Sequence, residues 1–258
     1  MKEIKPLRNK SLTKQELYLF DTVGVLKISD FLSKKDVETL SEIILSCPPR
    51  VMAGRGDKIR YDNIVEHSAE INNLAQSESI LLCVEPLINQ PFRIIESYGL
   101  FRQGNSIFYL HNGMSEYIKY NKEKYVQRNM SFAHTYHNGK LYCMFIKCIL
   151  YLTDINTDED GPFCYIEGSH KANFPLFDSS IDESEKLPLN TENFPSLKTI
   201  HVKSGDVLLL NEALLHGTLP KVTNGDRLLA ALSYAPCFIS DWKAADISTN
   251  NIHKIGHF

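Results

Sequence analysis

The chain has 258 residues, with 28 basic and 31 acidic side chains, a formal charge of −3 at pH 7 and 43% hydrophobic residues. A globular domain of this size buries enough surface to be stable without disulfides or a structural metal. Because opposite charges are interspersed and no apolar run reaches about 18 residues, we expect no nucleic-acid or membrane partner and a cytoplasmic protein. The 6 cysteines form no C-x-x-C pair, so we expect buried thiols.

Residues 12–90 are predicted to form a helical lead-in. Ser33 begins an S-x-x-D capping box, and the apolar residues after it recur at helical spacing, which predicts an amphipathic helix over residues 33–46. A short β-branched strand is expected before it, at 24–28, and another helix after it, at 80–88.

From residue 92 to 237 the chain has short apolar or alternating runs separated by Gly, Asn and Asp. We expect strands at 92–96, 106–110, 142–152, 163–166, 199–202, 207–210 and 228–234. Residues 113–140 and 177–198 lack periodicity, which predicts two long loops. The pattern is that of one α+β, mainly β, domain over residues 1–258, with a jelly-roll core and a C-terminal tail at 238–258.

The most informative motifs lie in the second half of the chain. They are LTD at 152–154, DG at 160–161, GSHK at 168–171, GD at 205–206 and HG at 216–217. In these motifs the chain resembles the phytanoyl-CoA dioxygenase-like family of iron(II)/2-oxoglutarate-dependent oxygenases, over roughly residues 20–237. The resemblance implies a double-stranded β-helix core in which two histidines and one carboxylate bind Fe(2+) and leave positions open for other ligands.

Two residues match the family pattern closely. The resemblance implies that His216 is the distant histidine ligand and that Arg227 holds the distal carboxylate of 2-oxoglutarate. A planar guanidinium in an apolar strand favours a bidentate carboxylate partner, although a structural ion pair is the alternative for Arg227 and a core or surface position the alternative for His216. Asn211 and Ser233 are further candidates for cosubstrate contact, and each is otherwise a polar residue of the barrel.

The first histidine ligand is ambiguous, because the chain contains no H-x-D or H-x-E sequence. Three histidines precede the strand expected at 142–152: His111, His134 and His137. Leu-His-Asn-Gly at 110–113 is similar to an LHGG segment of one branch of the family, which favours His111 and leaves His134 and His137 as alternatives.

With His111 as ligand, Gly113 stands where the family has its carboxylate. A glycine there resembles the iron/2-oxoglutarate halogenases, in which chloride takes the open coordination position. The alternatives are a carboxylate from elsewhere, Glu116 or Glu96, or a loss of metal affinity. His170, in the GSHK corner, is expected to fix that corner by backbone hydrogen bonds and not to bind iron.

The function expected from the resemblance is oxidation of an unactivated C–H bond of a small-molecule substrate by dioxygen, with 2-oxoglutarate decarboxylated to succinate. Chlorination at a site opened by Gly113 is the first alternative. A jelly-roll binding protein without catalysis is the second, and metal affinity separates it from the other two.

Overall fold

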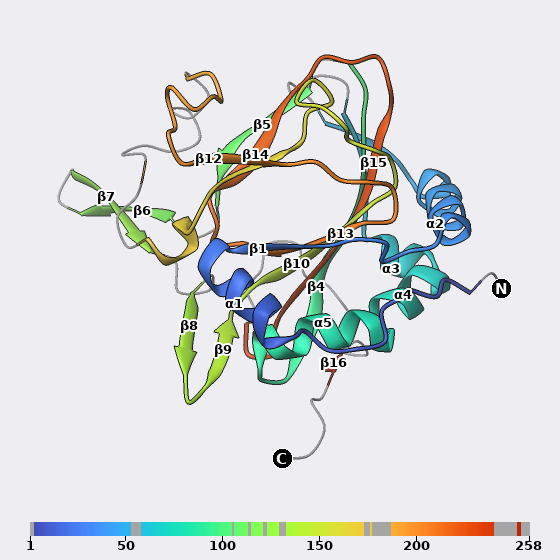
Figure 1. Ribbon diagram of the computed structural model, residues 1–258, viewed down its shortest axis with the longest axis horizontal. Coiled ribbons are helices and arrows are strands. Elements are labelled where there is room, and N and C mark those ends of the chain that lie inside the picture. The colour runs from blue at the N-terminus through green and yellow to red at the C-terminus, as the bar shows by residue number, and fades with distance from the viewer. Residues whose placement is uncertain are drawn as a thin grey trace.

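The computed structural model describes residues 3–52, 58–104, 106–112, 115–120, 123–128, 133–172, 176, 187–239 and 252–253; within 115–128 and 252–253 it describes the backbone alone. Two antiparallel sheets face each other and most helices lie along the outer side of one of them (Figure 1). Every helix in this described part is too short or too polar to cross a bilayer.

Among the described residues, the α-helices precede residue 90. They are α1 (Lys14–Val23), α2 (Lys34–Ser46), α3 (Ile64–His67), α4 (Ala69–Ala75) and α5 (Glu78–Ile88), and a 3₁₀ turn, η2, follows later at Ser169–Lys171. The Ser33 hydroxyl accepts a hydrogen bond from the amide of Asp36, which confirms the predicted cap of α2. Gly24 ends α1 with a φ of +90°, a conformation that glycine adopts without strain.

The larger sheet has the order β1-β13-β10-β15-β4-β3-β2, with β16 also paired to β4, and the smaller sheet has the order β12-β11-β14-β5. Two hairpins, β6-β7 and β8-β9, lie outside them. The bounds are β1 (Val25–Ile28), β2 (Arg50–Val51), β3 (Lys58–Asp62), β4 (Phe92–Arg102), β5 (Ser106–His111), β6 (Ser115–Tyr120), β7 (Glu123–Arg128), β8 (His134–His137), β9 (Lys140–Cys143), β10 (Ile146–Tyr151), β11 (Phe163–Ile166), β12 (Leu197–Ile200), β13 (Val207–Asn211), β14 (His216–Lys221), β15 (Arg227–Pro236) and β16 (Ile252–His253).

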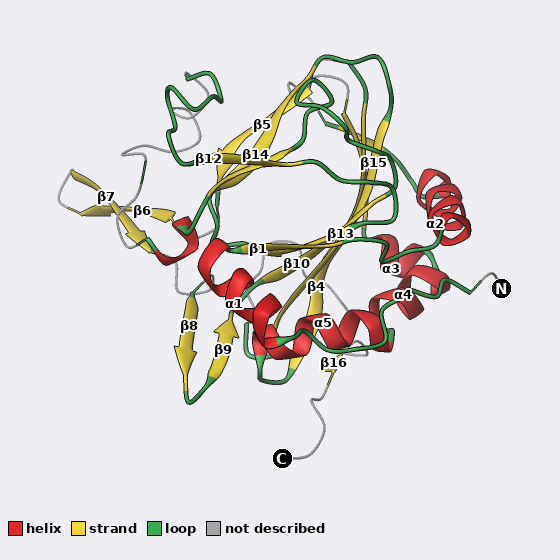
Figure 2. Ribbon diagram, viewed as in Figure 1, coloured by secondary structure: helices red, strands yellow, loops and turns green. Residues whose placement is uncertain are grey.

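The central strands of the larger sheet are buried on both faces, because helices cover the outer face and the smaller sheet covers the inner one (Figure 2). On β15, Leu228, Ala230 and Leu232 belong to the core beneath the helices, whereas Leu229 and Ala231 belong to the core between the sheets. This alternation assigns each side chain of these strands to one of two compartments. The fold is thus α+β, mainly β, with a double-stranded β-helix core, as predicted.

Two sequence predictions of local structure are wrong. The loop expected at 113–140 contains β6, β7 and β8, and the strand expected at 142–152 is divided at Met144 and Phe145 between β9 and β10. Three of the four residues of β8 are exposed, so that strand has no apolar face to produce a periodic pattern. Of the loop expected at 177–198, residues 177–186 lie outside the described residues, and its end forms the start of β12.

Candidate active site

Two histidines meet between the sheets. His111 ends β5 and His216 begins β14, and the antiparallel pairing of these strands places the two residues directly opposite each other. Their ring centroids are 4.5 Å apart, and the ring of Phe163 stacks on His216 at 5.5 Å. The structure thus brings His216 together with His111, and not with His134 or His137.

The same backbone contact orients both rings. His111 Nδ1 lies 2.7 Å from the carbonyl oxygen of Tyr109, and His216 Nδ1 lies 2.7 Å from that of Leu214. Since a carbonyl oxygen only accepts, Nδ1 carries the proton in each ring and Nε2 carries the lone pair of the neutral form. Burial, and then the neighbouring His111, lower the pKa of His216 well below its usual value. Neutral imidazoles oriented in this way suit a divalent metal.

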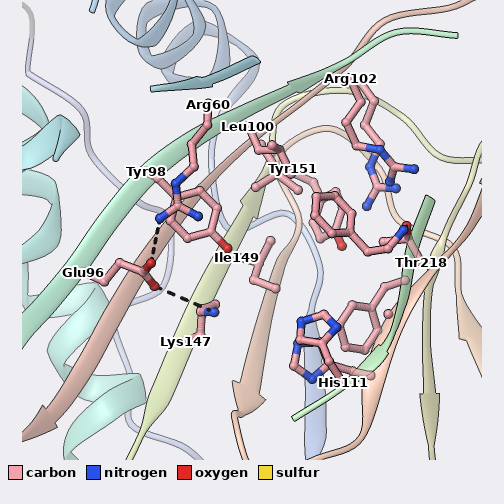
Figure 3. Close-up of a pocket in the computed structure, with 16 residues that line it drawn as sticks. Arg60, Glu96, Tyr98, Leu100, Arg102, His111, Lys147, Ile149, Tyr151 and Thr218 are labelled. Carbon is pink, nitrogen blue, oxygen red and sulfur yellow. Dashed lines mark hydrogen bonds and ion pairs between the residues drawn. The ribbon is translucent and has the colours of Figure 1, made fainter. Parts of the chain in front are cut away.

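Both histidines line a cavity of about 190 Å³ between the two sheets. Its wall consists of Arg60, Glu96, Tyr98, Leu100, Arg102, Phe108, His111, Lys147, Ile149, Tyr151, Phe163, His216, Gly217, Thr218, Arg227 and Leu229. Figure 3 shows Arg60, Glu96 and Lys147 on one side, and Arg102, Tyr151 and His111 on the other. The cavity therefore has two polar ends, which differ in how their charges are compensated.

Arg227 lies at one end of this cavity and is 2% exposed. Its Nη1 donates a hydrogen bond to the carbonyl oxygen of Gly161, and its guanidinium carbon lies 5.6 Å from the ring of Tyr151. Its Nε is buried without a hydrogen-bond partner. The neighbouring Arg102 is fully buried, and its Nη1 likewise has no partner. Unsatisfied donors on buried cations fit the carboxylate of a 2-oxo diacid.

The opposite end contains charges that pair with one another. Arg60 Nη2 donates to Glu96 Oε1 at 2.7 Å, and Lys147 Nζ lies 3.1 Å from Glu212 and 3.9 Å from Glu96. Burial alone would lower the pKa of Lys147, but the nearby Glu212 and Glu96 carboxylates outweigh it and raise that pKa. The Ser233 hydroxyl donates to the second oxygen of Glu96 at 3.3 Å. This end is a balanced ionic network that presents both signs of charge.

The other candidate histidines lie elsewhere. His134 packs outside the inter-sheet cavity, where its Nε2 lies 2.8 Å from Asp21 Oδ1 and its Nδ1 lies 2.7 Å from Asn211 Nδ2. His137 is exposed at the tip of the β8-β9 hairpin. His170 is fully buried, and its Nε2 binds the carbonyl oxygen of Asp21 at 2.9 Å, as expected for a residue that fixes the GSHK corner.

The remaining predicted residues have different placements. Asn211 faces the helix layer and contacts His134, so its side chain does not reach the cavity. Side chains alternate between the two faces of β13, and those of Leu208 and Leu210 lie on the face toward the cavity. Ser233 faces the interior but reaches the cavity through Glu96. Gly113 lies outside the described residues, and of Glu116 the structure describes the backbone in β6.

Sequence reasoning missed Arg102, Lys147 and Glu212. Each is a charged residue within or beside an apolar strand, such as Lys147 in the run IKCIL, and this is a signal that a systematic search for isolated charges would have detected. Within the described part of the chain, no three His, Cys, Asp or Glu side chains gather as a metal site. The two histidines therefore stand without a third protein ligand among the described residues.

Comparison with known proteins gives a family and a set of similar structures. Residues 20–229 match the model of the phytanoyl-CoA dioxygenase family. HygX from Streptomyces hygroscopicus, with nickel and 2-oxoglutarate bound, is 44% identical over 90% of each chain, with a TM-score of 0.82. The structure of HygX with nickel, 2-oxoglutarate and hygromycin B bound has a TM-score of 0.81 against this chain. The structure of HygX with iron bound is 43% identical and has a TM-score of 0.79.

More distant structures share the fold alone. EctD from S. alaskensis with bound Fe is 18% identical, covers 91% of this chain and 84% of its own, and has a TM-score of 0.61. A comparison with curated proteins gave no match.

Proposed function

The chain belongs to the phytanoyl-CoA dioxygenase family of iron- and 2-oxoglutarate-dependent oxygenases, and on this premise we propose that it oxidises an unactivated C–H bond of a polar small molecule. Dioxygen is the oxidant, and 2-oxoglutarate is decarboxylated to succinate. The observation that carries this proposal is one cavity lined by two imidazoles and by a buried guanidinium that lacks a carboxylate partner among the described residues.

Each role follows from the local chemistry. His111 and His216 hold the iron through Nε2, while their Nδ1–H bonds to backbone carbonyls keep the rings from turning. Arg227 binds the distal carboxylate of 2-oxoglutarate, because its buried Nε lacks an acceptor. A bound ferrous ion with 2-oxoglutarate supplies the oxidising chemistry. Phe163 and Leu229 contribute apolar wall to the same cavity.

The substrate binds at the end that contains Glu96, Arg60 and Lys147. Paired acidic and basic side chains offer both donors and acceptors, which suits a molecule rich in hydroxyl and amino groups. HygX, whose structure is similar, binds hygromycin B. Hygromycin B is therefore the first compound to test as a ligand of this chain.

Chlorination is the second candidate reaction, and one observation favours it. Glu96 is the carboxylate that lines the cavity with the histidines, and Arg60, Ser233 and Lys147 already hold it. Gly113 stands two residues after His111, where the family pattern has its carboxylate, so a bound iron would keep a position that water or chloride could take. If the reaction is chlorination, chloride alters the spectrum of the iron complex and a chlorinated product forms; if it is hydroxylation, the product forms equally in chloride-free buffer.

The proposal is tested by loading the protein with iron(II) under argon and adding 2-oxoglutarate. We expect a visible charge-transfer band, loss of this band in His216→Ala, and its retention in His201→Ala, an exposed histidine that bonds to Asp158. Succinate formed after oxygen is admitted, with and without hygromycin B, measures turnover. Protein that binds no iron(II) overturns the proposal and leaves a non-catalytic binding protein.

A further inference from the structure

A row of three polar side chains crosses the larger sheet at the end of the cavity opposite Arg227. The pairing register places Lys147 of β10 opposite Ser233 of β15, and Ser233 opposite Glu96 of β4. Directly opposed residues share one face of a sheet, and Lys147 and Glu96 both line the cavity. Because the serine between them is small, the two longer side chains can approach each other (Figure 3).

These two side chains face each other without a direct hydrogen bond. Lys147 Nζ lies 3.9 Å from Glu96 Oε2, which is too far for an N–H···O bond. Lys147 Nζ donates instead to Glu212 Oε1 at 3.1 Å, and Glu96 Oε2 accepts from the Ser233 hydroxyl at 3.3 Å. An ammonium has three donors and a carboxylate about four acceptor sites, so both atoms keep hydrogen-bonding capacity. We call the space between Nζ and Oε2 the Lys147–Glu96 gap.

The charges around this gap are balanced. Glu212 compensates the ammonium on one side, and Arg60 compensates the carboxylate on the other. Beyond Arg60, Asp62 is balanced by Arg50. The two side chains that face the gap are only 10% and 14% exposed, so water screens their charges weakly. A bound group with a net charge would therefore upset the balance and be repelled by the ammonium or by the carboxylate.

A neutral hydroxyl group matches the gap in size and in polarity. Its oxygen can accept from Nζ at about 2.8 Å while its proton is donated to Oε2 at about 2.7 Å. Two bonds of these lengths, meeting at roughly a right angle, span the 3.9 Å between the two atoms. An ammonium group has no lone pair for Nζ, and a carboxylate has no proton for Oε2. The gap thus fits a hydroxyl and disfavours either ion.

We infer that Lys147 and Glu96 are specificity-determining residues, which bind one neutral hydroxyl group of the substrate between them. This inference rests on the proposed function and deepens it, because it names a hydroxyl, and not an amino or acidic group, as the group recognised at this end of the cavity. The part of the substrate that enters the cavity is then an alcohol or a polyol. The competing explanation is that the ion pairs only brace β4 and β10 against the segment that follows β13.

The test measures the binding of probes that share one ring and differ in one group: cyclohexanol, cyclohexylammonium and cyclohexanecarboxylate. Zinc-loaded protein saturated with 2-oxoglutarate is used, because zinc is not redox-active and the cosubstrate blocks the arginine end of the cavity. Ligand-detected NMR at pH 7 gives the affinities. We expect the wild type to bind the alcohol about 10-fold or more tightly than either ion, since each ion forfeits a hydrogen bond to a charged group.

Two variants should change the order of affinities in opposite directions. Lys147→Met leaves the Glu96 and Glu212 carboxylates in excess, so cyclohexylammonium should become the tightest probe. Glu96→Gln leaves the Lys147 ammonium and Arg60 in excess, so cyclohexanecarboxylate should become the tightest. In both variants the affinity for the alcohol should fall by about 10-fold. The control, Lys198→Met, makes the same change at an exposed lysine of β12 and should keep the wild-type order.

The inference is overturned if the wild type binds none of the probes or binds an ion as tightly as the alcohol. It is also overturned if the variants keep the wild-type order, as bracing alone predicts. Should Lys147→Met fail to fold, Glu96→Gln, which is nearly isosteric, decides the question by itself. Calorimetric titration with zinc and 2-oxoglutarate comes first: protein that fails to bind either one contradicts the proposed function, whereas protein that binds both without preferring the alcohol contradicts only this inference.

Discussion

The protein packs two pairs of histidines with nearly the same ring spacing, 4.5 Å for the half-buried His111 and the buried His216, and 4.7 Å for the buried His134 and His170. In the first pair, each Nδ1 bonds to a backbone carbonyl two residues earlier, and each Nε2 carries the lone pair. In the second pair, His134 uses both nitrogens on Asp21, Asn211 and Cys143, whereas His170 binds the Asp21 carbonyl oxygen through Nε2 and its Nδ1 is buried without a partner, so only one ring of this pair has a nitrogen left over. The comparison teaches that the bonding of each ring nitrogen, and not ring proximity, separates a candidate metal site from a structural cluster.

The largest expected effect tests the first pair. Replacing His216 by alanine should weaken iron(II) or nickel binding by more than about 100-fold, since it removes one of two protein donors. The fold should persist, because His216 closes a cavity and is not the centre of a hydrophobic core. Metal titration by calorimetry, together with a thermal unfolding curve, measures both. Unchanged metal affinity would exclude His216 as a ligand.

The pH dependence of stability tests the second pair. Burial, and then the nearby His134, lower the pKa of His170 to about 4, against about 6.5 in the unfolded chain. Between these values the unfolded state takes up a proton that the native state does not. The contribution of His170 to the free energy of unfolding is therefore fully present above pH 6.5 and is lost as the pH falls to 4. We expect metal-free protein to lose roughly 2–3 kcal/mol from this group over that window.

The matched variant for this pH effect is His170→Gln, whose amide nitrogen still reaches the Asp21 carbonyl oxygen. Denaturant unfolding between pH 7 and 4 should show a shallower loss of stability in the variant. Equal slopes in both proteins would mean that another group causes the pH dependence.

Replacing His134 by alanine should destabilise the fold by about 2 kcal/mol, since Asp21 and Asn211 then lose a buried partner. Metal affinity should stay at the wild-type value, in contrast to His216→Ala. Urea unfolding and nickel titration on the same sample check both statements. A loss of metal binding without a loss of stability would reverse the roles assigned to the two pairs.

The smallest expected effect concerns Asn211. Its replacement by alanine should cost about 1 kcal/mol of stability through the lost bond to His134. The affinity for 2-oxoglutarate should not change, because Asn211 lies on the face of β13 that points away from the cavity. If the variant instead bound 2-oxoglutarate more weakly and kept its stability, Asn211 would be a contact of the cosubstrate.

The sequence predicted the fold class and the family correctly, because motifs such as GSHK and HG are local and carry a family resemblance, whereas the metal and cosubstrate residues that it indicates stay predictions. The choice between His111 and His134 was harder, since it depends on which strand pairs with β14, a contact between distant parts of the chain. Arg102 was missed for the same reason: its meaning comes from the register with Arg227. The hairpins at 115–143 were missed because hydrogen bonds between neighbouring strands leave no mark on hydrophobic periodicity.

One strand, β4, contributes to both ends of the cavity, with Glu96 in the balanced ionic network and Arg102 beside Arg227. The pairing of β4 with β15 is regular between these two residues, so six residue steps separate them by about 20 Å at roughly 3.3 Å per residue. A five-carbon cosubstrate with its distal carboxylate at the Arg227 end, as proposed above, would cover only part of this length. The remainder sets an upper limit on how far a substrate can extend inside the protein, and a larger molecule must leave part of its structure outside.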